Sequence, residues 1–181
     1  MNYTYQEREG GIAEALPLAG YFADREPICT ILGDNLIEYN VSRAAENFRR
    51  QSKGAKVILQ KVSDAQRFGV AEIRGSQVVN IEEKPKAPKS DFAVIGIYFY
   101  DSSVFEKIRR LKPSGRGELE ITDVNNFYIE EGSLTYEILE GWWTDAGTFD
   151  SLLRANRLVS ETGANKRSVK TDHKVQEGAG R

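Results

Sequence analysis

Short apolar runs and amphipathic segments alternate along most of this chain, and their spacing predicts its helices and strands. An apolar helical face extends from Ile12 to Phe22, because apolar side chains recur there with the period of a helix. A β-type run at 27–32, a polar helix around 42–53 and a second β-type run at 55–62 follow. Strands separated by helices in this order predict an α/β fold with a mostly parallel sheet.

The middle of the chain changes to closely spaced β-type segments at 69–73, 78–83 and 92–100. Because short polar links separate these segments, we expect an antiparallel insertion over the main sheet. The remaining apolar patterns predict helices at 102–111, 119–132 and 148–160 and a strand at 134–139.

The last residues differ from the rest, since 161–181 is charged, rich in Gly, Ser and Thr, and without a periodic apolar pattern. A segment of this composition cannot bury enough apolar surface to fold by itself. We therefore expect one domain over 1–160 and a disordered polar tail over 161–181.

The composition fits a single globular unit and argues against several functions. With 25 Lys and Arg against 27 Asp and Glu, the net charge is -2, so no basic field is available to hold nucleic acid or an anionic membrane. The single Cys29 cannot form an internal disulfide, which indicates a cytoplasmic protein. The only histidine, His173, lies in the polar tail, which disfavours histidine catalysis and multi-histidine metal sites.

Two aspartates follow strands directly. Asp34 ends the apolar run ILGDN at 31–35, and Asp145 follows Trp142 and Trp143. Ligands of open α/β sheets bind at the carboxyl ends of strands, and Mg²⁺ takes one or two protein carboxylates together with phosphates and water. The pair therefore suggests a shared divalent metal. The alternatives are a turn residue for Asp34 and a helix N-cap for Asp145.

Two basic segments could bind phosphate. At 81–86, Glu83 and Lys84 end a strand; Lys84 could hold a phosphate and Glu83 a sugar hydroxyl, or the segment could be a solvated hairpin edge. Arg116 is flanked by glycines in a loop that enters a helix. Its small neighbours would let backbone and guanidinium approach a phosphate, and the alternative is a plain flexible connector.

Together these motifs resemble the sugar-1-phosphate nucleotidyltransferases, most closely the glucose-1-phosphate thymidylyltransferases. The match covers nearly everything from Tyr3 to about Val159, in family order. The matching segments are GGIAEA at 10–15, ILGDN at 31–35, RFGV at 67–70, EEKPKAPKS at 82–90, FAVIGIYFYD at 92–101, RGELEITDVN at 116–125 and WWTDAGTFDS at 142–151. The resemblance implies a Rossmann-like, mostly parallel sheet with an antiparallel sugar-binding region.

The resemblance also implies roles for individual residues. Asp34 and Asp145 correspond to the magnesium ligands, and Lys84 and Arg116 to the groups that hold the sugar phosphate; these four would be the catalytic residues. The positions that correspond to the base-recognition and sugar-pocket residues are Gln6 and Gly11 for thymine, and Gly69, Glu83 and the strand from Val94 to Gly96 for the sugar. Within that strand, Ile95 stands where the family commonly has Thr.

The implied reaction joins glucose 1-phosphate to the α-phosphorus of dTTP and gives dTDP-glucose and pyrophosphate, with Mg²⁺ as cofactor and a homo-oligomer as the expected assembly. A sugar phosphate is already an anionic nucleophile, so no general base is needed. The alternatives are an enzyme that uses UTP or CTP, and a non-catalytic sugar-phosphate binding module.

One part of the family pattern has no counterpart in this chain. Family members open with a strand and a Gly-x-Gly-Thr-Arg-Leu-type loop, followed by a lysine, which bind the triphosphate. No segment here matches that loop. We therefore expect the amino-terminal strands of the sheet to be missing, and the 181-residue chain to be weak or inactive alone.

Overall fold

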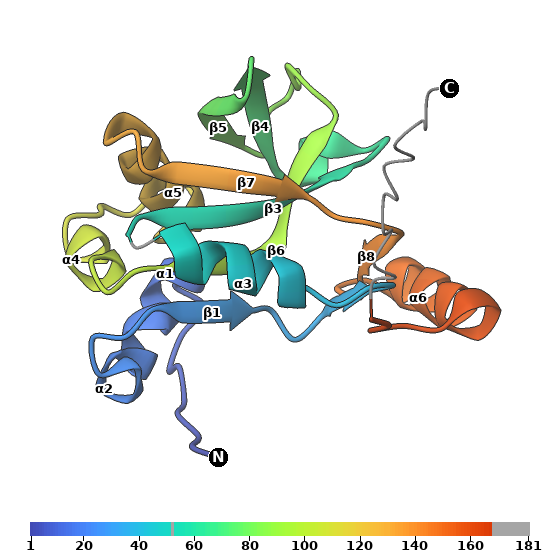
Figure 1. The fold of residues 1–181 in the computed structure, drawn as a ribbon, viewed down its shortest axis with the longest axis horizontal. Coiled ribbons are helices and arrows are strands. Elements are labelled where there is room, and N and C mark those ends of the chain that lie inside the picture. Colours follow the sequence, from blue (N-terminus) through green and yellow to red (C-terminus); the bar gives the residue numbers. More distant parts are fainter. Residues whose placement is uncertain (52, 168–181) are drawn as a thin grey trace, which may run out of the picture.

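The computed structural model describes residues 1–51 and 53–167, which form a six-stranded sheet, a two-stranded sheet and surrounding helices (Figure 1). The strands are β1 Ile28–Ile31, β2 Asn35–Ile37, β3 Ala55–Lys61, β4 Gly69–Arg74, β5 Gln77–Glu83, β6 Phe92–Tyr100, β7 Leu134–Ile138 and β8 Trp143–Asp145. The helices are α1 Ile12–Ala15, η1 Leu16–Ala19, α2 Gly20–Ala23, α3 Ser42–Gln51, η2 Ala65–Arg67, α4 Val104–Ile108, α5 Ile121–Glu130 and α6 Phe149–Thr162.

The α/β class is confirmed, but the main sheet is mixed rather than mostly parallel. Its order is β5-β4-β6-β3-β7, and β1 also pairs with β6. Among the described strands only β3 and β7 pair in parallel, while β6 runs antiparallel to β1, β3 and β4. Strands β1 and β3, which are connected through helix α3, run in the same direction. The strand-helix-strand pattern of the sequence predicts this parallel orientation. The strand that lies between them, however, is β6, which enters from the β4-β5 hairpin in the opposite direction.

Helices cover both faces of this sheet. On one face, Ala44 and Phe48 of α3 pack against apolar side chains of β3 and β6. On the other face, residues of α1, η1, α4 and α5 form the larger core with the opposite side chains of the same strands. Because successive side chains of a strand alternate between faces, Ile95 lies in the α3 core and Val94 in the other.

The predicted helix from Ile12 to Phe22 is divided into three short pieces, α1, η1 and α2. Pro17 lies at the start of the 3-10 turn η1, and Gly20 begins α2. Proline lacks a backbone N–H and glycine weakens a helix interior, so the apolar face persists although the regular helix does not.

Regular structure continues past residue 160, after which we expected the polar tail to begin. Helix α6 extends to Thr162, and the backbone N–H groups of Asn165 and Lys166 donate to the carbonyls of Ile37 and Glu38 at 2.8 and 2.7 Å. These bonds attach the segment to the end of β2 and offset its poor apolar content. The rest of the predicted tail, residues 168–181 with His173, lies outside the described residues.

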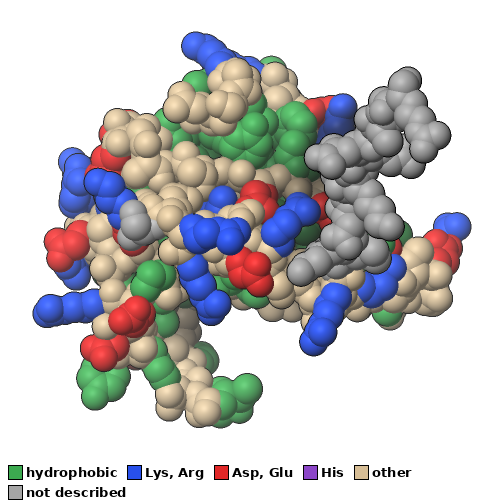
Figure 2. All heavy atoms as spheres, viewed as in Figure 1, with side chains coloured by type: hydrophobic (Ala, Val, Ile, Leu, Met, Phe, Trp, Pro, Cys, Tyr) green, Lys and Arg blue, Asp and Glu red, His purple; other side chains and the backbone are tan. Residues whose placement is uncertain are grey.

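The surface agrees with the balanced composition. On the face drawn in Figure 2, basic and acidic side chains are interspersed rather than gathered by sign. Within 1–51 and 53–167, no helix is both long and apolar enough to cross a membrane.

Candidate functional site

The small β2-β8 sheet brings the two predicted metal ligands together. Asn35 pairs with Asp145 in this ladder, and the N–H of Ala146 donates to the carbonyl of Asp34 at 2.8 Å. An ideal Cβ atom on Gly147 would lie 3.4 Å from Asp34 Oδ2 and 3.5 Å from Asp145 Oδ2. Both carboxylates therefore have an oxygen next to the same small space, beside a residue that has no side chain.

The two alternatives for these aspartates have different outcomes. The N-cap of α6 is Thr148 and not Asp145, which leaves the Asp145 carboxylate available for other partners. Asp34 does lie in a turn, closed by the bond from Asn35 N–H to the carbonyl of Leu32 at 3.1 Å. A place in a turn does not occupy the Asp34 carboxylate, so the turn is compatible with the metal role, which stays a prediction.

Asn35, which the sequence analysis did not single out, holds this corner together. Its Oδ1 accepts bonds from Gly96 N–H at 2.9 Å and from the Trp143 indole at 2.7 Å, while its Nδ2 donates to Asp34 at 2.8 Å. A Cβ atom on Gly96 would lie 2.6 Å from Asn35 Nδ2, so only glycine permits this approach. No sequence signal marks the contact, because its partners are distant in the chain.

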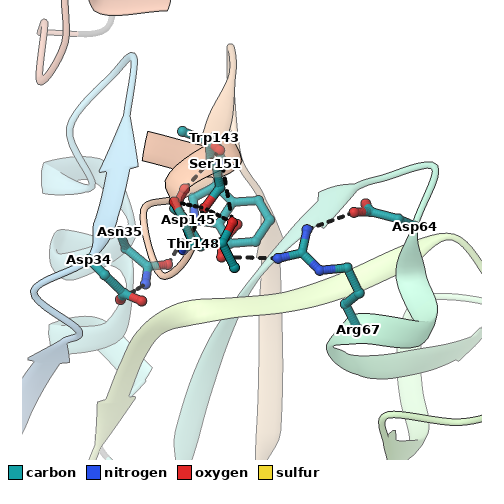
Figure 3. A network of polar contacts seen from close by, with 9 residues as sticks. Asp34, Asn35, Asp64, Arg67, Trp143, Asp145, Thr148 and Ser151 are labelled. Carbon is teal, nitrogen blue, oxygen red and sulfur yellow. Dashed lines mark hydrogen bonds and ion pairs between the residues drawn. The ribbon is translucent and has the colours of Figure 1, made fainter. Parts of the chain in front are cut away.

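Arg67 is a second residue that the sequence analysis missed. Its guanidinium lies 3.2 Å from Asp145 Oδ2 and 2.8 Å from Asp64 Oδ2 (Figure 3). The hydrogen bond to Asp64 and the charge of Asp145 hold the pKa of Arg67 above its ordinary value. Arg67 is therefore a permanent cation next to the aspartate pair.

The predicted sugar-pocket residues meet where β4 begins and β5 ends. Gly69 is the register partner of Glu83, and the buried Thr122 on α5 donates to Glu83 Oε2 at 2.6 Å. An added Cβ on Gly69 would lie 3.2 Å from Thr122 Oγ1 and 3.4 Å from the same Glu83 oxygen. The glycine thus keeps the space beside a fixed carboxylate open, which suits an acceptor for hydroxyl groups.

Lys84 follows β5 in an unusual backbone conformation. Its φ is 44°, in the left-handed region that non-glycine residues rarely adopt, and its N–H donates to the carbonyl of Phe68 at 3.0 Å. Strain of this kind concentrates at functional sites. The side chain is exposed, and its charge helps to lower the pKa of the Glu120 carboxyl.

Arg116 lies in the cleft among carboxylates. Its Nη2 contacts Glu120 Oε2 at 2.8 Å, Glu118 at 3.3 Å and Glu83 at 3.6 Å. Burial alone would raise the pKa of Glu120, but hydrogen bonds from Arg116 and Ser114 outweigh burial and hold it below the ordinary 4.5. A phosphate at Arg116 would have to share the guanidinium with these acids.

These residues line one cleft of about 270 Å³, close to the lower limit for small-molecule sites. The predicted site residues in its lining are Asp34, Gly69, Glu83, Lys84, Val94, Gly96, Arg116 and Asp145. These residues, which are far apart in the sequence, thus lie around one cleft, and their roles there stay a prediction.

Gln6 and Gly11 lie in an adjoining groove of about 500 Å³, which shares Ile12, Leu32 and Glu118 with the cleft. Gln6 Nε2 donates to the carbonyl of Gly11 at 3.3 Å. Gly11 has a φ of 90°, and a Cβ there would lie 2.6 Å from the carbonyl of Leu119. The structure therefore puts the two predicted base-recognition residues next to each other, beside the main cleft.

The aspartate pair would supply two carboxylate ligands to a divalent cation. The described part of the chain contains no group of three or more His, Cys, Asp or Glu side chains suited to a metal, so the other ligands would have to come from elsewhere. Two carboxylates with hard oxygen donors match the requirement of Mg²⁺, which takes its other ligands from phosphates and water.

Comparison with known proteins gives consistent matches. The family model for nucleotidyl transferases matches residues 1–162. A glucose-1-phosphate thymidylyltransferase of Neisseria meningitidis is 41% identical over 163 residues, which cover 88% of this chain and 57% of the relative. A low-salt glycan biosynthesis nucleotidyltransferase of Haloferax volcanii is 35% identical over 181 residues, which cover 98% of this chain and 51% of the relative. The chain therefore spans between half and three fifths of these relatives.

Solved structures agree with the fold. A Bacillus anthracis protein, described as a candidate glucose-1-phosphate thymidylyltransferase in complex with a sucrose, is 54% identical with a TM-score of 0.82, covering 87% of this chain and 64% of its own. A UDP-glucose pyrophosphorylase complexed with UDP-glucose has a TM-score of 0.80 at 20% identity, covering 88% of this chain and 66% of its own. The second likeness concerns the fold alone.

Proposed function

The chain belongs to the nucleotidyl transferase family, and we propose that it carries the sugar-phosphate half of a glucose-1-phosphate thymidylyltransferase site. The observation that supports this most directly is the common cleft of Asp34, Asp145, Glu83, Lys84 and Arg116. The cleft combines acceptors for sugar hydroxyls, cations for a phosphate and two oxygen ligands for a metal. The names of the relatives at 40% identity or more agree with this substrate choice.

In this proposal Glu83 accepts hydrogen bonds from the sugar, and Lys84 and Arg116 hold its phosphate. Glu83 is fixed by Thr122, so its carboxylate does not need to be ordered when the sugar binds. Lys84 contributes a compact charge, and Arg116 can offer two parallel N–H groups to phosphate oxygens. Both cations also align the phosphate oxygen of glucose 1-phosphate that acts as the nucleophile.

The reaction forms a bond between a phosphate oxygen of glucose 1-phosphate and the α-phosphorus of dTTP, and breaks the bond to the β-phosphate. The products are dTDP-glucose and pyrophosphate. Since the nucleophile is already anionic, the contribution of Lys84 and Arg116 is to position it and reduce repulsion between two anions. Mg²⁺ held by Asp34 and Asp145 would neutralise charge on the nucleotide phosphates. Gln6 and Gly11 would contact the thymine base.

Calorimetric titration of this chain with glucose 1-phosphate tests the sugar-phosphate site. We expect binding, and a loss of about tenfold in affinity in Lys84→Ala, because one charge-assisted contact to phosphate is removed. Lys86→Ala is the matched control, since Lys86 is exposed on the same loop and outside the cleft lining. Equal affinities for the three proteins, or no binding by the unmodified chain, would refute this assignment.

Pyrophosphate release with glucose 1-phosphate and dTTP, UTP or CTP tests the choice of nucleotide. The assay uses a protein completed with the family's triphosphate-binding loop, because we expect the 181-residue chain to be weak or inactive alone. The proposal expects the highest rate with dTTP. A preference for UTP would instead assign the cleft to a uridylyl transfer. Sugar-phosphate binding without any turnover would favour the binding module.

A further inference from the structure

Asn125, a residue in the lining of the cleft, has a polar side-chain atom without a hydrogen-bond partner among the described residues. The residue lies on α5, is 1% exposed and belongs to the cleft lining. Its Nδ2 is buried and has no hydrogen-bond partner among the described residues. It is the one buried side-chain nitrogen or oxygen of the described residues in this condition. Leaving such a donor unpaired costs free energy, which points to a partner that arrives from outside the chain.

One hydrogen bond from the core holds the side-chain amide of Asn125 but leaves its Nδ2 without a partner. Tyr100 donates its hydroxyl proton to Asn125 Oδ1 at 2.7 Å. Tyr100 is fully buried between the rings of Tyr98 and Tyr128 and does not line the cleft. A single hydroxyl can pair with only one of the two polar atoms of the amide, whichever way the amide is turned. The other atom, Nδ2 in this structure, has no hydrogen-bond partner among the described residues, although its residue lines the cleft.

The neighbouring Asn126 shows the contrasting case. Its Oδ1 accepts from Ile81 N–H at 3.1 Å, and its Nδ2 donates to the Ile81 carbonyl at 2.9 Å. Both polar ends of Asn126 are therefore used to attach α5 to β5. Two neighbouring asparagines on α5 therefore differ: the amide of Asn126 is bonded at both ends to β5, whereas Asn125 Nδ2 has no hydrogen-bond partner among the described residues.

We infer that Asn125 donates a hydrogen bond to a hydroxyl of the sugar ring and so helps to select the sugar. Asn125 lies one turn after Thr122 on α5, and residues spaced in this way share a helix face. Thr122 binds Glu83, the proposed sugar acceptor. A neutral amide suits a hydroxyl, whereas the phosphate already has Lys84 and Arg116. This inference rests on the proposed function and extends it to a specificity residue.

Calorimetry with glucose 1-phosphate and its 2-, 3-, 4- and 6-deoxy analogues tests the inference. We expect the unmodified chain to bind one of these analogues about tenfold more weakly than the parent sugar. Asn125→Ala should bind the parent about tenfold more weakly and that analogue unchanged, so that discrimination at one hydroxyl disappears. A general structural defect would instead weaken all the ligands together.

Asn126→Ala is the matched control, and it should keep the full discrimination although its melting temperature falls. Should Asn125→Ala fail to fold, the double variant Asn125→Leu with Tyr100→Phe replaces both partners by apolar groups and leaves no orphan; the same loss of discrimination is expected. Affinities that change equally for all sugars, or not at all, would overturn the inference and leave a bound water as the partner. Failure of the unmodified chain to bind glucose 1-phosphate would instead refute the proposed function.

Discussion

At the scale of single residues, the ion pair between Arg67 and Asp145 affects the charge of the proposed cation site. Asp145 Oδ2 faces the space beside Gly147 and is also the atom that Arg67 contacts. Asp34 Oδ2 faces the same space from the other side. The guanidinium therefore partly neutralises one carboxylate of the proposed cation site and opposes the approach of a second cation.

Arg67→Ala should raise the affinity of the nucleotide-free protein for Mn²⁺. An ion pair exposed to this degree is worth up to about 1 kcal/mol, so an increase of roughly two- to fivefold is expected. The amount of free Mn²⁺ measured by electron paramagnetic resonance gives this affinity directly. Arg74→Ala removes an arginine that pairs with Glu72 instead, and it should leave the affinity unchanged. Weaker Mn²⁺ binding in Arg67→Ala would show that Arg67 orders Asp145 rather than competing for it.

Glu120 should contribute to stability in a pH-dependent way. Its pKa in the folded chain is lowered below the ordinary 4.5, because hydrogen bonds from Arg116 and Ser114 outweigh burial. A carboxyl with a lowered folded pKa stabilises the fold above its unfolded pKa, and this contribution is lost as the pH falls through the folded value. Glu120→Gln should therefore be less stable than the unmodified chain above pH 4.5, and the gap should narrow below it.

Urea unfolding at a series of pH values measures this gap. Glu106→Gln is the control, since Glu106 forms an exposed pair with Arg109 and its loss should change stability little at any pH. A gap for Glu120→Gln that stays constant with pH would contradict the assignment.

The sequence predicted the candidate site residues that end or follow strands, but it did not predict the residues that contact them. Asp34, Glu83, Lys84 and Asp145 all end or follow strands, a position that a periodic pattern reveals. Their partners carry no such mark. Thr122 reaches Glu83 across 39 positions, and Arg67 reaches Asp145 across 78. Contacts over these separations depend on the order of the strands, which local periodicity does not encode.

At the scale of elements, the start of α6 determines the turn that carries Asp145. Thr148 accepts from Ser151 N–H at 3.1 Å, and Ser151 Oγ accepts from Thr148 N–H at 3.0 Å, which closes a reciprocal cap. The residues between this cap and β8 are Ala146 and Gly147. Because the linker is so short, the cap also restrains the Asp145 carboxylate.

Thr148→Ala should reduce the free energy of unfolding by about 1 kcal/mol, the usual cost of a lost N-cap. The midpoint of urea unfolding at constant m-value measures it. Ser160→Ala is the control in the same helix; its hydroxyl bonds to the carbonyl of Arg157 in an exposed part of α6, and its removal should stay within about 0.5 kcal/mol. Equal losses in both variants would mean that the cap has no special role.

Elements were predicted well where a run is long and periodic, and poorly where chain breakers or short strands intervene. The β-type runs at 55–62 and 92–100 became β3 and β6 with nearly the same bounds. The three-residue strand β2 has too few positions to show a period, and it forms because β8 pairs with it. Pro17 and Gly20 interrupt α1 to α2 although the apolar pattern continues.

At the scale of the whole molecule, the cleft depends on topology that the sequence did not reveal. A mostly parallel sheet would keep β1 beside β3, whereas β6 lies between them and carries Val94 and Gly96 into the cleft. The antiparallel insertion over 69–100 was foreseen, but its last strand is the centre of the sheet and not a cover over it. The proposed sugar site therefore includes the central strand of the sheet.

This connection makes ligand binding a test of the whole fold. Cleft residues come from β4, β5, β6, α5 and both strands of the small sheet, so unfolding of any part should release the ligand. Glucose 1-phosphate at 100 times its dissociation constant then adds about 2.7 kcal/mol, or roughly 5 to 10 °C in melting temperature for a domain of this size. Glucose at the same concentration lacks the phosphate that Lys84 and Arg116 would hold, so it should give a much smaller shift. If calorimetry shows saturation by glucose 1-phosphate while the melting temperature stays constant, the cleft opens before the sheet unfolds, and the site and the sheet centre are not one cooperative unit.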